Sequence, residues 1–166
     1  MVLLGGIRVE RQPPWVLQSA PTAPKVPQVW RVPVNGGDAA RVTSGGGFEA
    51  FESVDGSIVY VQRGNDVWRV PAGGSEESLV VAGGLEWGFW GVSRNDICWL
   101  DRRSRQEHLV ECLAPATGQK RTIAVFESGL AIPGPPGFTI SPDGRSILIA
   151  RTDHGGYDLM LVENYR

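Results

Sequence analysis

The stretch that decides the fold is VWRVPVNGG, Val29–Gly37, because it recurs as VWRVPAGG, Val67–Gly74. The tryptophans at the second position of the two copies stand 38 residues apart. A weaker third copy, VECLAPATG, begins at Val110, and a fourth, LMLVE, lies at Leu159–Glu163. A match at a steady spacing indicates an internal repeat. Each of the first three copies joins β-forming residues to a glycine-containing turn, so we expect a strand followed by a corner.

A second element, a tight turn between two strand-like runs, precedes each of the last three copies. Its instances centre on Asp55-Gly56, Asn95-Asp96 and Asp143-Gly144. An Asp-Gly pair between β-formers is a strong hairpin signal, because the turn needs a positive φ that glycine adopts without steric cost. Gly64-Asn65 marks a further two-residue turn. A fourth strand is then expected after each glycine corner, at 39–43, 78–81 and 121–126.

Four antiparallel strands about every 40 residues are the period of a propeller blade. The sequence therefore predicts an all-β fold, a β-propeller segment of about three to three and a half four-stranded antiparallel blades in an incomplete ring. We expect a half-blade at 29–43, complete blades at 48–81 and 85–126, and a last blade at 137–163 without its outer strand. Residues 1–28 are expected to form an irregular proline-rich N-terminal segment, with a possible edge strand at 15–17, and 29–166 a partial propeller domain.

Two stretches resemble a known family. SPDGRSIL, Ser141–Leu148, looks like the signature of TolB-like, WD-repeat-like propellers. The ending DLMLVENYR, Asp158–Arg166, resembles the C-terminus of acidobacterial-type propellers attached to winged-helix regulators or protein kinases. The resemblance runs from about Val29 to the end and implies a detached C-terminal portion of a larger regulator. It brings no DNA-binding or kinase activity to this chain, because neither module is present in the sequence.

Composition narrows the classes of partner. A net charge of −2 gives no electrostatic footprint for nucleic acid or for an anionic membrane, and the basic run at 102–105 is explained by a polar hairpin tip. No signal-peptide core or membrane-length apolar run is present, so we expect a cytoplasmic protein if the chain is complete as given. Cys98 and Cys112 are expected to face each other. Buried free thiols are preferred over a disulfide, because cross-strand disulfides are uncommon and the cytosol is reducing, but the sequence leaves their redox state open.

No pattern predicts catalysis, a cofactor or a metal site. The chain has no Gly-x-Ser-x-Gly elbow, and its two histidines, His108 and His154, fall at predicted hairpin turns. Gly45–Gly47 runs into a strand-like segment, whereas a phosphate cradle needs a glycine loop that opens a helix. The aspartates at 55, 96 and 143 repeat at turns, which explains them without metal ligation.

The remaining candidate site is an aromatic cluster, Trp87, Phe89, Trp90 and Trp99. Strand alternation places Trp87 and Phe89 on one face, Trp90 on the other, and Trp99 on the next strand. Packing between blades is the first interpretation, and an aromatic platform for a sugar or a peptide is the second. The sequence thus predicts a non-enzymatic scaffold for protein–protein interaction or ligand sensing, with a protein partner or self-association through exposed blade faces. An accessory or substrate-binding propeller of an enzyme, or a truncated product without function, are the alternatives.

Overall fold

The computed structural model describes residues 15–22, 26–73, 76–102, 107–127, 134–153 and 156–163. These residues form antiparallel strands and their connections, and none of them belongs to a helix of the length and apolarity that crossing a membrane requires. The strands are β1 (Trp15–Thr22), β2 (Val26–Pro33), β3 (Ala40–Arg41), β4 (Glu49–Glu52), β5 (Ile58–Arg63), β6 (Asp66–Pro71), β7 (Ser78–Val81), β8 (Trp90–Val92), β9 (Ile97–Asp101), β10 (Glu107–Ala114), β11 (Gln119–Glu127), β12 (Phe138–Ile140), β13 (Ser146–Asp153) and β14 (Gly156–Glu163).

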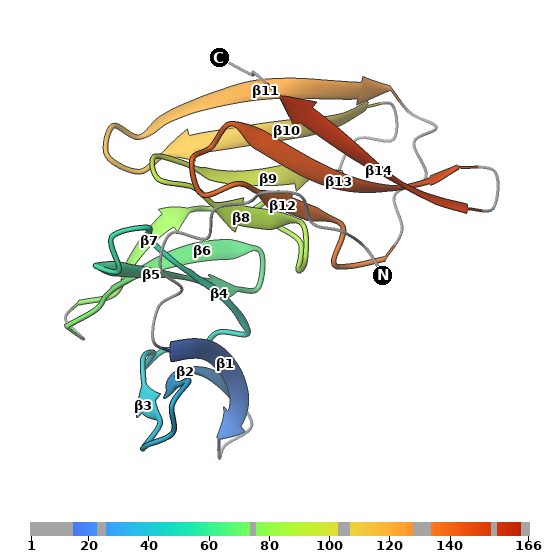
Figure 1. The fold of residues 1–166 in the computed structure, drawn as a ribbon. Coiled ribbons are helices and arrows are strands. Elements are labelled where there is room, and N and C mark those ends of the chain that lie inside the picture. Colours follow the sequence, from blue (N-terminus) through green and yellow to red (C-terminus); the bar gives the residue numbers. More distant parts are fainter. Residues whose placement is uncertain are drawn as a thin grey trace.

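The strands form four sheets that succeed one another in chain order (Figure 1). We call them blade 1 (β1–β3), blade 2 (β4–β7), blade 3 (β8–β11) and blade 4 (β12–β14). Blades 2 and 3 have four strands each. The equivalent tryptophans of the repeat lie in β2 and β6, so blade 1 holds the second, third and fourth strands of a blade, and blade 4 holds the first three. This arrangement confirms the predicted propeller segment.

Regular pairing starts earlier in the chain than the prolines suggest. β1 pairs with β2 along its whole length, from Trp15 opposite Pro33 to Thr22 opposite Val26. Among the described strands β1 lies at an edge of its sheet, where a proline such as Pro21 removes few ladder hydrogen bonds. The sheet therefore extends to the N-terminal side of residue 29, and residues 1–14 of the predicted irregular segment lie outside the described part of the chain.

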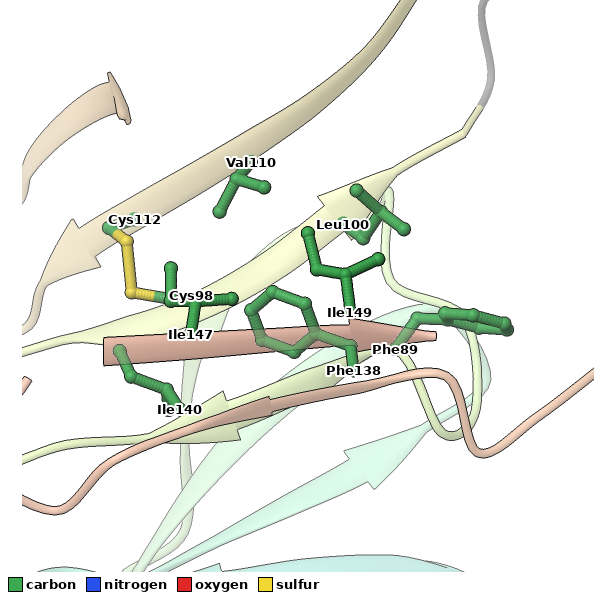
Figure 2. Close-up of a cluster of buried hydrophobic side chains, with 9 residues drawn as sticks. All are labelled: Phe89, Cys98, Leu100, Val110, Cys112, Phe138, Ile140, Ile147 and Ile149. Atoms are coloured by element: carbon green, nitrogen blue, oxygen red, sulfur yellow. A yellow bond between two sulfur atoms is a disulfide. The ribbon is translucent and has the colours of Figure 1, made fainter. Parts of the chain in front are cut away.

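A hydrophobic core fills each junction between neighbouring blades. Strand alternation divides the side chains, so that Ile97 and Trp99 of β9 face blade 2 while Cys98 and Leu100 face blade 4. The core of blades 1 and 2 contains Val29, Val59, Val61 and Val70, and that of blades 2 and 3 contains Tyr60, Val67, Val81, Leu85, Trp90, Ile97 and Trp99. The core of blades 3 and 4 contains Phe89, Cys98, Leu100, Val110, Cys112, Phe138, Ile140, Ile147 and Ile149 (Figure 2).

The two cysteines correct one prediction. Cys98 of β9 and Cys112 of β10 stand directly opposite each other, as the repeat predicted, with their Cα atoms 4.1 Å apart. The prediction of free thiols is wrong, because the two sulfurs form a disulfide (Figure 2). Their shared register brings both side chains to the same fully buried face of the sheet, close enough to bond, and this geometry outweighs the expectation from a reducing compartment.

Both complete blades carry a β-bulge at the same position of the repeat. The register of β6 with β7 shifts between Val67 and Trp68, and that of β10 with β11 shifts between Val110 and Glu111. In each case the fourth strand has one additional residue. The repeat thus preserves an irregularity of the ladder as well as its strands.

Candidate interaction surface

Asp55 and Asp143, in the turns that join the first two strands of blades 2 and 4, have structural roles. The Oδ1 atom of Asp55 accepts hydrogen bonds from the Ser53 hydroxyl, at 2.7 Å, and from the Ser57 backbone N–H, at 3.0 Å. These bonds, led by that from Ser53, lower the pKa of Asp55 to about 2. Asp143 accepts a hydrogen bond from the Ser141 hydroxyl at 2.6 Å in the same way, and its pKa is also lowered. Both carboxylates are committed to their own turns.

The other polar residues considered in the sequence do not gather at one site. Asp96 binds the guanidinium of Arg121 with both oxygens, at 2.7 and 2.8 Å, and so ties a turn to β11. His108 is half-buried inside β10, which begins one residue earlier, so its predicted place in a turn is wrong. His154 and most of the predicted basic tip at 102–105 lie outside the described residues. Within the described ranges, no three His, Cys, Asp or Glu side chains gather as a metal site would require.

The four aromatic residues of the predicted cluster do not share one surface. Phe89, Trp90 and Trp99 are 1–2% exposed, whereas Trp87 is 54% exposed. The predicted alternation fails because residues 87–89 form a turn and β8 begins only at Trp90. Gly88 allows this turn, since its φ of +75° is one that other residues rarely adopt.

Trp90 connects blades 2 and 3 through its indole N–H. This group donates to a carboxylate oxygen of Glu49 at 2.6 Å and to the side-chain oxygen of Gln62 at 2.9 Å. The edge of one ring faces the other where Phe51 meets Trp90, with the ring centroids 4.7 Å apart. Burial raises the pKa of Glu49, and hydrogen bonds from Gly88 and Trp90 partly offset that rise. Trp90 is therefore a structural residue of the junction.

Phe89 belongs to the junction of blades 3 and 4, where it lies at one end of the apolar cluster (Figure 2). The guanidinium of Arg102 lies 3.9 Å from the centroid of its ring and also pairs with Glu86. Gly137 approaches so closely that an added Cβ would overlap the Phe89 ring. Phe89 therefore contacts both a cation and a close backbone segment.

Trp87 is the member of the cluster that remains available to a partner. The neighbouring Gly88 is held by three hydrogen bonds: its N–H donates to Glu49 at 3.1 Å, and its carbonyl accepts from the N–H groups of Gly137, at 2.9 Å, and Phe138. A Cβ on Gly88 would lie 2.6 Å from Pro135, so the turn contacts the segment that leads into blade 4. Pro135 and Pro136 are exposed beside it. We call Trp87, Pro135 and Pro136 the Trp87 surface.

Sequence reasoning missed the two prolines and Glu49 as neighbours of Gly88, the residue next to Trp87. Glu49 lies in blade 2, and Pro135 lies before blade 4, so only the stacking of three sheets brings them to one turn. A glycine between two aromatic residues was the available local signal, because a bulky run interrupted by Gly marks close approach of another backbone.

Solved structures share this arrangement of sheets. TolB from Acinetobacter baumannii matches with a TM-score of 0.65 and 17% identity, over 89% of this chain and 37% of that chain. A putative TolB from Agrobacterium tumefaciens gives 0.64 and 15%, over 90% and 57%. An oligogalacturonate lyase in complex with manganese gives 0.59 and 13%, over 90% and 59%. The chain spans less than two thirds of the length of each of these proteins.

No protein-family model matches the sequence, and no curated protein matches it. At these low identities, the structural likeness speaks for the fold alone. The four successive sheets, their antiparallel order and the match to two TolB structures lead to one conclusion. The chain has the fold of a TolB-like β-propeller, of which it forms an incomplete segment.

Proposed function

We propose that this chain is a non-catalytic propeller scaffold that binds a protein partner through the Trp87 surface. The observation that carries the proposal is a tryptophan exposed by 54% on a turn whose backbone groups are already bonded. Tryptophan is enriched among the residues that contribute most to binding. A turn that is fixed before binding loses little conformational entropy when a partner covers it.

The surroundings of Trp87 support a small protein interface. Its apolar groups are the exposed indole and the two exposed prolines, which contact the turn at Gly88. The charge nearest in the sequence, on Glu86, is neutralised by Arg102 in an ion pair. A polar rim around an apolar centre is the usual anatomy of an interface. The partner expected here presents an apolar or aromatic side chain, with no strong requirement for charge.

In this proposal the chain acts as the C-terminal portion of a larger regulator. The acidobacterial-type ending at Asp158–Arg166 supports that role, as does the fraction of the solved propellers that the chain covers, 37–59%. The Trp87 surface would then serve as a docking or sensing point for the whole regulator.

A second candidate is a substrate-binding propeller that belongs to an enzyme. The oligogalacturonate lyase with the same fold favours it, because an exposed indole also provides a face on which a sugar ring stacks. The described residues hold no cluster of three or more carboxylate, imidazole or thiol groups that fits the manganese of that complex. This candidate therefore concerns sugar binding, and no catalytic step is assigned to the chain.

The test is a search for peptides in a displayed random library, selected on the wild-type chain. We expect selected peptides to lose at least about tenfold in affinity on Trp87→Ser, equivalent to about 1.4 kcal/mol. Val54→Ser is the matched control, since Val54 is 49% exposed in a hairpin turn of blade 2, away from the Trp87 surface. It should leave the affinity unchanged.

Three results would overturn the proposal. Peptides that bind Trp87→Ser as well as wild type would place the interaction elsewhere. A titration with oligogalacturonates that quenches tryptophan fluorescence only while Trp87 is present would favour the second candidate. No binding of either ligand by a folded chain would support a truncated product without function.

A further inference from the structure

Blade 4 exposes a face that its equivalent in blade 3 buries. Ile97 opposite Val92 and Ile147 opposite Ile140 mark the same position of the repeat, so the residues that follow, Cys98 and Leu148, are equivalent. Cys98 is fully buried, whereas Leu148 is 36% exposed. Their cross-strand neighbours differ more, because Cys112 is fully buried and Leu161, opposite Leu148, is 53% exposed. Blade 4 covers this face of blade 3, and no described residue covers it in blade 4.

Blade 1 has a face of the opposite kind that no described sheet covers. Arg31 of β2 reaches blade 2, where its guanidinium pairs with Glu52 at 2.6 Å. The alternating residues Trp30 and Val32 therefore point away from blade 2. In blade 2 the equivalent of Val32 is Val70, which is 1% exposed because blade 1 covers it. Val32 itself is only partly buried.

Each internal junction joins two different faces. We call the face toward the next blade in the chain the forward face, and the other the backward face. All three junctions pack a forward face on a backward face. One face of each kind lacks a described sheet against it: the forward face of blade 4 (Leu148, Leu161), which is exposed, and the backward face of blade 1 (Trp30, Val32), which is partly buried.

We propose that copies of this chain associate head to tail, with the forward face of blade 4 in one copy packed on the backward face of blade 1 in the next. A second copy fits both faces, because it carries a backward face for the forward face of blade 4 and a forward face for the backward face of blade 1. This pairing of faces already occurs at all three junctions within the chain. Such a contact is heterologous, so it forms a ring where the rotation closes and an open chain where it does not. The proposal uses none of the residues of the Trp87 surface.

The test measures mass by light scattering during size-exclusion chromatography over a range of protein concentrations. The wild-type chain should show a mass above the monomer that falls reversibly on dilution. Leu148→Glu and Val32→Glu each place a charge on one face, and each variant should be monomeric. An equimolar mixture of the two should form a complex of two chains and grow no further, because one forward face and one backward face remain intact.

Val54→Glu is the matched control, since it adds the same charge to an exposed valine away from both faces, and it should keep the wild-type mass. Circular dichroism melts establish that each variant folds.

A monomeric wild type at every concentration overturns the proposal, as does a mixture of folded variants that stays monomeric. If Val32→Glu still associates while Leu148→Glu does not, the contact is symmetric and the head-to-tail arrangement is wrong. Trp87→Ser should keep the wild-type mass, which separates this test from that of the proposed partner.

Discussion

The junction of blades 2 and 3 and the junction of blades 3 and 4 join the same repeat in different ways. The first carries a buried polar network, in which the Trp90 indole serves Glu49 and Gln62 of the other blade. The second is an apolar cluster (Figure 2). Beside it, Gly88 lies against Pro135 and Pro136, and Gly137 lies against Phe89. Strand alternation and blade spacing are common to both junctions, so we infer that these two features define the fold. The contacts inside a junction are free to differ.

The largest effect is expected in the apolar junction. Leu100 is fully buried there, so Leu100→Ala leaves a cavity and should lower the free energy of unfolding by about 4 kcal/mol. Leu79→Ala is the matched control, because Leu79 is 48% exposed, and it should change stability by less than about 1 kcal/mol. Urea denaturation measures both. Equal losses would show that the apolar junction contributes no more than the surface.

The next largest effect on stability is expected at Gly88, where the backbone lies close to Pro135 and Pro136. Gly88→Ala forces a non-glycine residue into a φ of +75° and places a Cβ 2.8 Å from the Pro136 Cα. Gly56→Ala imposes the same backbone strain, at +72°, with no atom within 4 Å of the new Cβ. We expect about 1 kcal/mol for Gly56→Ala and about 3 kcal/mol for Gly88→Ala, with the difference due to overlap. Similar melting temperatures for the two variants would contradict the close approach.

The polar junction should respond to the loss of one donor. Trp90→Phe keeps an aromatic ring against Phe51 but removes the N–H that bonds Glu49 and Gln62. Two acceptors then lose their shared donor, and we expect a loss of about 2 kcal/mol in the free energy of unfolding. A double-mutant cycle with Glu49→Gln measures the part of this loss that belongs to the charged acceptor. Additive losses in the cycle would mean that the two side chains do not interact.

The smallest effect is a pH dependence at the same junction. Burial raises the pKa of Glu49 above its ordinary value of 4.5, so the folded state binds this proton more tightly than the unfolded state. The stability that the group contributes is full below the unfolded pKa and is lost as the pH rises through the folded one. Glu49→Gln has no carboxyl group to ionise and so avoids this loss. As the pH rises above 4.5, the melting temperature of the variant should therefore rise relative to that of the wild type. Glu76→Gln, at an exposed position, is the control; a gap independent of pH would refute the expectation.

The sequence predicted most of the fold because the decisive signals are local. The repeat around Trp30 and Trp68, and the Asp-Gly turns, specify strands, corners and register within about 40 residues. The register of Cys98 with Cys112 followed from the same pattern, but their bond depends on geometry and on redox conditions that no pattern encodes. The sequence predicted an edge strand at 15–17, whereas β1 extends to Thr22, because a proline such as Pro21 is tolerated at a sheet edge.

The candidate site was less predictable because its contacts join different blades. The aromatic run around Gly88 reads as a strand in the sequence, and only contact with Pro135 and Glu49 makes it a turn with Trp87 outside. Likewise, Leu148 looks like any core residue of the repeat, and its exposure follows from the absence of a described sheet beyond blade 4. Local alternation assigns a side chain to a face, but the neighbour of that face is a tertiary property.

The shared bulge of blades 2 and 3 has a consequence for protein design. Val67 and Val110 precede the bulge, and the position in β14 that corresponds to them is Leu159, because Leu161 matches Cys112. A synthetic peptide or grafted segment meant to extend blade 4 along β14 should therefore carry one extra residue opposite Leu159-Met160. A strand built with uninterrupted alternation would present its apolar side chains to the wrong face beyond that point.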